Sequence, residues 1–269
     1  MRVRADLGTE YRRMERLVVE QDLHTVCQEA GCPNIYECWS QRTATFMILG
    51  DTCTRSCGFC AVKTGRPPSY DTDEPRRVAE AIARLGLKYA VITSVDRDEV
   101  KDGGSIVWHN TIKAVKSLNP QTTLETLIPD FKGEQENIGR IIDAAPEVVS
   151  HNIETVERLT RQVRVQAKYW RRMQVLKLLK EGGMRTKSGI MLGLGETREE
   201  VLQCMEDLRS NDVDVITIGQ YLQPTHRHLA VQRFVHPDEF AEYREIGYEM
   251  GFDYVESGPL VRSSYHSEK

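Results

Sequence analysis

Strand-like and helix-like segments alternate along most of this chain. Apolar or β-branched runs predict strands over residues 46–50, 89–95, 122–128, 148–154, 184–192 and 213–221. Amphipathic patterns predict helices over residues 76–85, 104–118, 134–144, 166–181, 197–210 and 237–250. Because parallel neighbours need crossover connections, this alternation predicts an α/β fold with a mainly parallel sheet.

The number of strand–helix units limits the possible architectures. Six units are too few for a closed eight-unit barrel, so the pattern alone leaves an open or partial barrel and a doubly wound sheet. Runs such as 90–93 and 215–218 are apolar on both faces, as a sheet covered by helices requires. In a barrel, the functional site lies at the C-terminal ends of the strands.

The composition disfavours several classes of function. The formal net charge of −4 is unlike that of a general nucleic-acid binder. The sequence has no run of 18 apolar residues, so no membrane span is expected. Residues 1–10 lack the charged-then-apolar pattern of a secretory signal, so we expect a cytoplasmic protein.

Cysteine is the residue type that points most directly to chemistry. Six of the seven cysteines lie within the first 60 residues, in two triplets. An odd count without a secretory signal disfavours a disulfide framework, and clustered thiols favour metal binding. Cys204 stands apart, on the same helical pattern as Val201, Met205 and Leu208. We therefore predict that Cys204 is a buried structural thiol.

The second triplet, Cys53-x3-Cys57-x2-Cys60, directly follows the first predicted strand. Three thiolates on one loop suit three irons of a [4Fe-4S] cluster and leave the fourth iron open for a small molecule. Structural zinc needs four ligands, often from two CxxC pairs, and only Cys57 and Cys60 form such a pair. This spacing is the signature of the radical S-adenosylmethionine superfamily, which the aromatic Phe59 also fits.

The first triplet, Cys27-x4-Cys32-x5-Cys38, predicts a second cluster. It again supplies three thiolates, so this cluster needs a fourth ligand or an open iron. The alternative is a set of three structural thiols near the barrel mouth.

From Cys27 to His266 the chain resembles the lipoyl synthase family. The segments that carry the resemblance are CQEAGCPNIYECW, GDTCTRSCGFCAV, TSVDRDEVKDGG, SHNIETVERL, SGIMLGLGET and GPLVRSSYH. Biotin synthase and other relatives share the second triplet but lack the first triplet and the RSSY ending. The resemblance implies a partial (βα)6 TIM-like barrel over residues 45–251. An N-terminal extension (1–44) and a C-terminal tail (252–269) would cover its mouth.

The resemblance also implies the activity and the cluster ligands. Two sulfur atoms would be inserted at C6 and C8 of an octanoyl group on a lysine of a carrier domain, giving the dihydrolipoyl group. A radical [4Fe-4S] cluster would cleave S-adenosylmethionine, and an auxiliary [4Fe-4S] cluster would be consumed as the sulfur source. The implied ligands are Cys53, Cys57 and Cys60 for the radical cluster and Cys27, Cys32, Cys38 and Ser264 for the auxiliary one.

Partners follow from the same resemblance. The carrier would be the lipoyl domain of a 2-oxoacid dehydrogenase E2 subunit or the glycine cleavage H protein. Flavodoxin or ferredoxin would supply electrons, and iron–sulfur assembly proteins would build the clusters. Neither a nucleic acid nor a membrane is expected as a partner.

Several residues near strand ends are candidates for contact with S-adenosylmethionine. Asn152 and Glu154 end a predicted strand and could bind ribose hydroxyls, or they could be turn and capping residues. Gly103 and Gly104 permit close approach of a ligand, although a plain turn explains them equally well. Gly189, Gly193 and Gly195 are three glycines within seven residues, which suggests close approach because glycine otherwise weakens a strand. The full candidate set is Phe59, Gly103, Gly104, Asn152, Glu154, Gly189 and Gly193.

Two further features stay open. A basic set favours either a solvated helix face or a docking surface for an acidic carrier; it comprises Arg161, Arg164, Lys168, Arg171 and Arg172. Lys187 could contact the substrate or end a strand in solvent.

Two alternative functions also stay open. One is another radical enzyme, such as a methylthiotransferase or a biotin-synthase-like protein. The other is an electron carrier or metal-stapled binding module.

Overall fold

The computed structural model describes residues 8–265. Residues 1–7 and 266–269, which belong to the predicted extension and tail, lie outside the described residues, and so does the His266 of the last matched motif. The main sheet contains β1 (His24–Thr25), β2 (Thr45–Ile48), β5 (Tyr89–Ser94), β6 (Thr123–Leu127), β7 (Val148–Ser150), β8 (Thr186–Leu192), β9 (Val215–Gln220) and β10 (Tyr254–Gly258). A small parallel pair joins β3 (Thr52–Cys53) to β4 (Lys63–Thr64).

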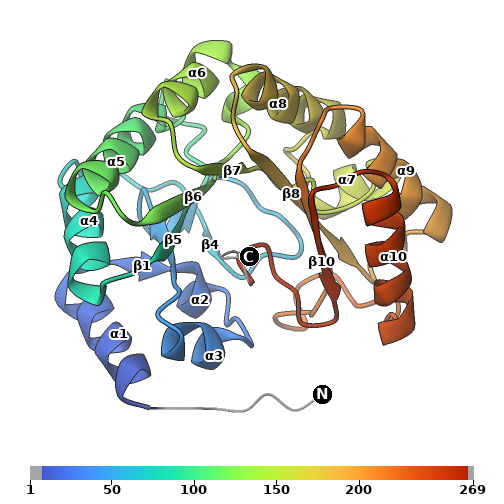
Figure 1. The fold of residues 1–269 in the computed structure, drawn as a ribbon, viewed down its shortest axis with the longest axis horizontal. Coiled ribbons are helices and arrows are strands. Elements are labelled where there is room, and N and C mark those ends of the chain that lie inside the picture. The colour runs from blue at the N-terminus through green and yellow to red at the C-terminus, as the bar shows by residue number, and fades with distance from the viewer. Residues whose placement is uncertain (1–7, 266–269) are drawn as a thin grey trace.

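Helices connect these strands. They are α1 (Thr9–Glu20), α2 (Val26–Glu29), α3 (Ile35–Ser40), α4 (Glu74–Leu85), α5 (Ser105–Leu118), α6 (Gln135–Ala144), α7 (Glu157–Val163), α8 (Tyr169–Glu181), α9 (Arg198–Arg209) and α10 (Pro237–Glu249), with a 3-10 turn at Phe131–Gly133. In Figure 1, α4, α5, α6, α8, α9 and α10 form an outer layer around the curved sheet.

The strand order identifies an open barrel. From β2 to β10 every strand runs parallel to its neighbour, and spatial order follows chain order. A doubly wound sheet would reverse its order at a switch point, and this sheet does not. The six predicted strands are β2 and β5–β9, so the predicted partial barrel is confirmed.

The sheet extends beyond the six predicted strands at both edges. Strand β1, from the predicted extension, pairs antiparallel with β2. Strand β10, from the predicted tail, pairs parallel with β9. Of the residues in β10 only Val255 is buried, so no apolar run marks this strand in the sequence.

The absence of a clear strand or helix pattern up to about Trp39 predicts a loop-rich N-terminus. This prediction is wrong, because α1, α2 and α3 lie there. Helix α1 buries Met14, Leu17 and Val18, which are spaced i, i+3 and i+4 on one face. The short α7 was also missed, within the segment that joins β7 to α8.

Local signals explain several element boundaries. Gly86 ends α4 in the left-handed conformation, with φ of 63°. The Thr197 side chain and the Glu200 side chain form a capping box at the start of α9, as their spacing predicts. Strand β7 ends at Ser150 instead of the predicted Glu154. The chain turns there, with Glu154 at φ of 72°, and rejoins the sheet through a single bridge to Ile190.

The barrel interior contains a buried ion pair near the start of β8. The Lys187 ammonium lies 3.1 Å from the Glu125 carboxylate, and Ser150 and Tyr89 donate hydrogen bonds to the same carboxylate. Because Lys187 is the second residue of its strand, it lies at the end of the barrel opposite the mouth. Lys187 is therefore a paired core residue and not a solvated strand end.

Candidate active site

The Cys53–Cys60 loop follows β2 at the C-terminal end of the barrel. All three thiols are free and half-buried. Burial raises the pKa of the Cys60 thiol to about 11, and the nearby charges of Cys57, Cys53 and Glu154 act in the same direction. The structure therefore brings the second triplet together beside Glu154. Thiols with raised pKa values become thiolates when they bind a metal.

The first half of this loop is fastened to the end of β5. The Cys53 Sγ accepts hydrogen bonds from the backbone N–H groups of Arg55 and Asp96, at 3.4 and 3.3 Å. The Thr54 hydroxyl donates to the Asp96 carbonyl and accepts from the Asp98 N–H. These bonds fix the position of the Cys53 thiol relative to the sheet.

Arg55 anchors the same half from inside the barrel. Its side chain is 3% exposed, and its guanidinium forms a bidentate pair with Asp98 at 2.7 and 2.8 Å. It also donates to Asp130 at 2.6 Å and lies 3.4 Å from Asp96. Burial alone would raise the pKa of Asp130, but the Arg55 hydrogen bond and charge hold it well below its usual range.

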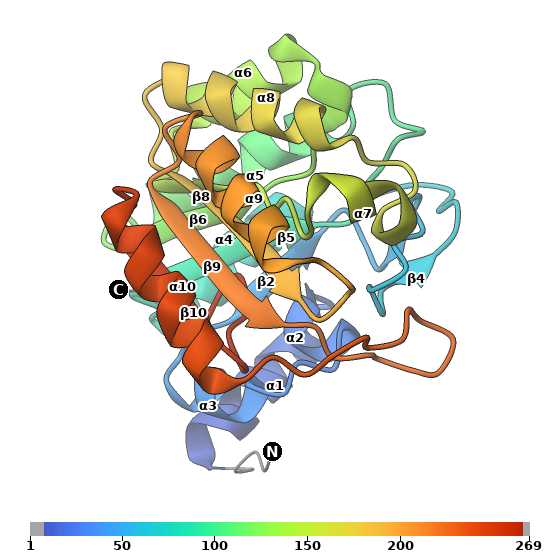
Figure 2. The same ribbon diagram turned by 90° about the vertical axis from the view of Figure 1, so that its right-hand side faces the viewer.

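The second half of the loop is held between two other segments. The Gly58 N–H donates to the Val163 carbonyl and its carbonyl accepts from the Leu229 N–H, both at 2.9 Å. The His228 Nε2 lies 3.1 Å from the Cys60 carbonyl. A Cβ on Gly58 would lie 2.9 Å from the Leu229 side chain, so glycine permits this packing. Figure 2 shows α7, β4 and the loop from β9 to α10 at this same end of the barrel.

The first triplet lies in and between α2 and α3. Burial raises the pKa of the Cys27 thiol to about 11, against a smaller opposite effect of the Trp39 indole N–H. That N–H is buried and has no acceptor within hydrogen-bonding geometry among the described residues. A cluster thiolate or sulfide would supply the missing acceptor, so these residues fit a cluster.

The C-terminal tail packs against this first triplet. The Asn34 amide donates to the Leu260 carbonyl at 2.7 Å, and the Tyr265 hydroxyl donates to Glu37 at 3.3 Å. Burial raises the pKa of the Cys32 thiol, and the nearby Arg262 guanidinium partly offsets this effect. Ser264 lies half-buried within this packed segment. The structure thus brings the RSSY segment and the Cys32–Cys38 segment together.

Asn152 and Glu154 lie beside the second triplet. The Asn152 amide donates to the Glu154 carboxylate at 3.1 Å. The negative charge of Glu154 contributes to the raised pKa of the Cys60 thiol. The Asn152 Oδ1 is buried and has no hydrogen-bond donor among the described residues. A buried acceptor without a donor leaves room for a ligand hydroxyl or amine at this place.

The glycine candidates have a structural explanation of their own. A Cβ on Gly104 would lie 2.4 Å from Leu49, and one on Gly193 would lie 2.3 Å from Gln220. Both glycines also have positive φ, at 85° and 99°. A Cβ on Gly103 would lie 3.2 Å from Phe131, and one on Gly189 would lie 2.6 Å from Thr217. The packing of the chain requires glycine at these positions, so glycine there does not by itself indicate a ligand.

The basic set divides by burial. Arg161 and Lys168 are exposed, Arg171 is half-buried, and Arg164 and Arg172 are buried. The Arg164 guanidinium lies over the Phe59 ring, 5.9 Å from its centroid. The Nε atoms of both buried arginines and the Nη1 of Arg172 have no acceptor among the described residues. Burial lowers the pKa of Arg172 to about 9. The prediction that the basic set forms a solvated helix face is therefore wrong for Arg164 and Arg172.

Buried guanidinium N–H groups without acceptors can donate to a bound anion, and sequence reasoning missed these two groups. The Arg164 Nη1 also lies 3.8 Å from the Glu154 carboxylate. One signal could have revealed Arg172. It shares the apolar face of α8 with Leu176 and Leu179, at i, i+4 and i+7. A charged residue in such a stripe is either paired or poised to bind a ligand.

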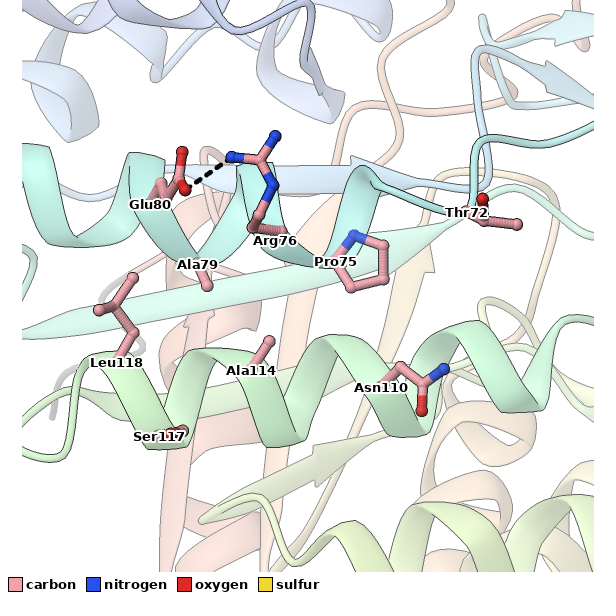
Figure 3. A pocket seen from close by; sticks show the side chains of 9 residues that line it. All are labelled: Thr72, Pro75, Arg76, Ala79, Glu80, Asn110, Ala114, Ser117 and Leu118. Atoms are coloured by element: carbon pink, nitrogen blue, oxygen red, sulfur yellow. Dashed lines mark hydrogen bonds and ion pairs between the residues drawn. The ribbon is translucent and has the colours of Figure 1, made fainter.

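Two other observations bear on the nature of the site. Within residues 8–265, no three Cys, His, Asp or Glu side chains converge as a single metal ion requires. In a four-iron cluster each thiolate binds a different iron, so a cluster does not require three side chains to converge on one point. A cleft between α4 and α5 lies on the outer surface, where Arg76 donates to Glu80, and none of its lining residues is a candidate (Figure 3).

Comparison with known proteins agrees with this geometry. Residues 47–208 match the radical SAM superfamily. A lipoyl synthase of Christiangramia forsetii is 61% identical over 270 residues, covering 100% of this chain and 92% of the relative. The chain belongs to the lipoyl synthase family. A mitochondrial lipoyl synthase of Nematostella vectensis is 59% identical and covers 100% of this chain and 93% of the relative.

A solved structure confirms the fold. Streptococcus suis SuiB bound to its precursor peptide SuiA has a TM-score of 0.64 and 11% identity, covering 94% of this chain and 55% of that one. Family membership gives sulfur insertion as the reaction, with S-adenosylmethionine and a [4Fe-4S] cluster as cofactors. Within residues 8–265, no helix is long and apolar enough to cross a bilayer.

Cys204 provides an internal control for the cluster ligands. It is 1% exposed in α9, and burial raises the pKa of its thiol to about 12. We expect Cys204→Ala to keep the iron and sulfide content of the wild type and to lose about 1 kcal/mol of stability. Cys57→Ala should lose about four irons, one cluster's worth. Metal analysis after anaerobic reconstitution checks both, and iron loss in Cys204→Ala would contradict the structural role of this thiol.

Proposed function

We propose that this protein inserts sulfur at C6 and C8 of an octanoyl group held on a lysine of a lipoyl carrier domain, in the cytoplasm. One observation carries the proposal: the RSSY tail packs against the first cysteine triplet and crosses the C-terminal end of β9. There a Cβ on Gly219 would lie 2.2 Å from the Val261 carbonyl oxygen. The second triplet lies at the same end of the barrel.

We assign the radical cluster to Cys53, Cys57 and Cys60. When bound, this cluster and S-adenosylmethionine supply a 5′-deoxyadenosyl radical that removes hydrogen from an unactivated carbon. Arg55, Thr54 and Gly58 hold the loop in place through the contacts described above. Their role is to keep the three thiols at fixed positions at the mouth.

The residues around this loop suit the remaining groups of S-adenosylmethionine. Asn152 and Glu154 offer an acceptor and a carboxylate for ribose hydroxyls. The unpaired N–H groups of Arg164 and Arg172 suit the carboxylate of the methionine part, since a charge-assisted hydrogen bond offsets the cost of burying a cation. Phe59 packs beneath Arg164. A Cβ on Gly189 would lie 3.1 Å from the Asn152 Oδ1, so glycine there leaves this acceptor accessible. Gly103, Gly104 and Gly193 remain candidates for close backbone approach to the ligand.

We assign the auxiliary cluster to Cys27, Cys32, Cys38 and Ser264. Serine oxygen is harder than thiolate and is an unusual ligand for iron in such clusters. A weakly held iron suits a cluster that gives up its sulfur. On this assignment, residues 1–44 and 252–269 carry the auxiliary cluster, and residues 45–251 carry the radical site.

Partners follow from the reaction. The carrier is an E2 lipoyl domain or a glycine cleavage H protein. Flavodoxin or ferredoxin supplies single electrons, and iron–sulfur assembly proteins rebuild the consumed cluster. The net charge of −4 gives no support to nucleic-acid binding.

The test is an anaerobic assay with a short octanoyl-lysine peptide. Reconstituted protein receives S-adenosylmethionine and dithionite, and mass spectrometry follows the peptide. We expect about eight irons per chain before reaction, a peptide that gains two sulfurs, and loss of the auxiliary cluster afterwards. Formation of 5′-deoxyadenosine without sulfur gain would remove the octanoyl substrate from the proposal, and protein without iron would remove the cluster assignment.

A further inference from the structure

One flank of the mouth carries exposed apolar and basic side chains together. We call residues 161–171, from the end of α7 to the start of α8, the α7–α8 rim. Val165 is 61% exposed and Trp170 is 56% exposed. Arg161 and Lys168 are exposed beside them, and no ion pair with either is present among the described residues. Large exposed apolar groups bordered by charges mark interaction surfaces.

The α7–α8 rim directly borders the second cysteine triplet. The Gln166 amide nitrogen lies 3.3 Å from the Ser56 hydroxyl, and its Oε1 accepts from the Ser56 N–H at 3.4 Å. The Val163 carbonyl accepts from the Gly58 N–H at 2.9 Å. Any protein that rests on this rim therefore lies next to the loop that we assign to the radical cluster. Figure 2 shows α7 beside the segment leading to β4 at this end of the barrel.

The exposed indole of Trp170 is held in one orientation. Its Nε1 donates to the Glu157 carboxylate at 2.6 Å, and its ring meets Tyr169 edge-on at 5.2 Å between centroids. The hydrogen bond orients the ring but leaves the Glu157 carboxylate charged, just outside the rim, while the nearby Arg158 is paired with Glu200. A rigid aromatic side chain loses little conformational entropy on binding, so it suits the role of an anchor.

The charge of the rim indicates the chemistry of the partner. The whole chain carries a net charge of −4, yet the accessible charges that remain unpaired on the rim, those of Arg161 and Lys168, are positive. Arg171, at 25% side-chain exposure, adds a third positive charge and lies 3.9 Å from Asp130. A local basic surface on an acidic protein favours an acidic partner through charge complementarity.

We propose that the α7–α8 rim is the docking surface for an acidic carrier domain, which lays its acylated lysine across the rim into the barrel mouth. The inference rests on the proposed function and identifies where its substrate protein binds. A reductant is also an acidic partner in principle, but it needs only brief proximity. The carrier must stay while two carbon–hydrogen bonds are broken, which favours a rim with apolar anchors.

The test compares an octanoylated, acidic lipoyl domain with a short octanoyl-lysine peptide, using dithionite as the reductant. For Arg161→Glu with Lys168→Glu, we expect the KM and the Kd for the domain to rise about tenfold or more, with a weaker dependence on salt. Trp170→Ala should raise both about tenfold. The kcat/KM for the peptide should stay within about twofold of the wild type, because the peptide does not reach the rim.

Matched variants control for general effects. Lys177→Glu changes an exposed lysine on the same helix, farther from the mouth, and Tyr248→Ala removes an exposed aromatic ring on α10. The docking proposal is overturned if the rim variants bind the domain as tightly as these controls. Equal loss of peptide activity would also overturn it, since the rim would then support the site itself. In a second series with reduced flavodoxin in place of dithionite, a defect of the rim variants confined to that series would assign the rim to the reductant and overturn the carrier proposal.

Direct binding separates this inference from the proposed function. If wild-type protein binds the domain through the rim but adds no sulfur to the peptide, the proposed function fails and the docking surface remains. If the peptide gains sulfur and the rim variants bind the domain normally, the docking surface fails alone.

Discussion

Replacing Gly219 with alanine is expected to lower the iron content from about eight to about four per chain, by displacing the C-terminal tail from the first cysteine triplet. Gly219 is the penultimate residue of β9, at the barrel mouth. A Cβ there would lie 2.2 Å from the Val261 carbonyl oxygen and 3.1 Å from its carbon. Both are backbone atoms, so no side-chain rotation relieves the clash, and the tail must move away.

Movement of the tail has a local consequence. Val261 lies between two hydrogen bonds of the tail: the Asn34 amide donates to the Leu260 carbonyl before it, and the Tyr265 hydroxyl donates to Glu37 after it. The segment between these bonds carries Arg262 and Ser264. These hydrogen bonds connect the tail to the first cysteine triplet, and neither of them involves the second triplet. We therefore expect the radical cluster to persist in Gly219→Ala, with cleavage of S-adenosylmethionine retained and sulfur insertion lost.

Gly258→Ala is the matched control for this experiment. It lies in β10 and faces the same residue, but its Cβ would lie 3.4 Å from the Val261 side chain, an ordinary contact. Iron analysis, electron paramagnetic resonance and the peptide assay are applied to both variants. Eight irons and normal sulfur insertion in Gly219→Ala would contradict the idea that the tail completes the auxiliary site.

The periodic parts of the fold could be predicted because their signals are local. The strands β2 and β5–β9 are short apolar runs, and each helix between them has one apolar face. Thr197 and Glu200 marked the start of α9 by their spacing alone. The open barrel itself needed the neighbour order of the strands, which six repeating units do not determine.

The N-terminal helices and β10 were missed for different reasons. Helix α1 does carry a periodic signal, in Met14, Leu17 and Val18, but the adjacent cysteine-rich segment drew the interpretation toward loops. Strand β10 has no such signal, because it contributes one buried side chain and depends on pairing with β9.

The residues of the site could be predicted where their spacing in the sequence indicates their chemistry. They could not be predicted where their role depends on which distant residues the fold brings beside them. The two cysteine triplets are visible in the sequence as they stand. The buried states of Arg164 and Arg172 depend on how α7 and α8 close over the barrel, although the apolar stripe of α8 gave a hint for Arg172. Arg55 lies inside a recognised motif, yet its partners are 41 to 75 residues away in sequence, counting from Asp96 to Asp130.

Arg55→Gln is expected to reduce stability by about 3–5 kcal/mol and to reduce occupancy of the radical cluster. The cost arises because Asp130, whose side chain is fully buried, would keep its charge without its close cationic partner. Glutamine retains a hydrogen-bond donor but cannot replace the charge or the bidentate pair with Asp98. Anaerobic denaturation with iron analysis measures both effects.

A double variant tests this cause directly. Adding Asp130→Asn to Arg55→Gln removes a buried carboxylate whose next cationic partner, Arg171, lies 3.9 Å away, so we expect it to restore more than half of the lost stability. It should restore less of the cluster occupancy, because the loop still lacks its anchor to Asp98 at 2.7 Å. This difference separates two roles of one side chain: balancing buried charge and positioning the thiols of Cys53 and Cys57. If Arg55→Gln costs less than about 1 kcal/mol and keeps eight irons, neither role holds, and the loop must be positioned by its backbone hydrogen bonds alone.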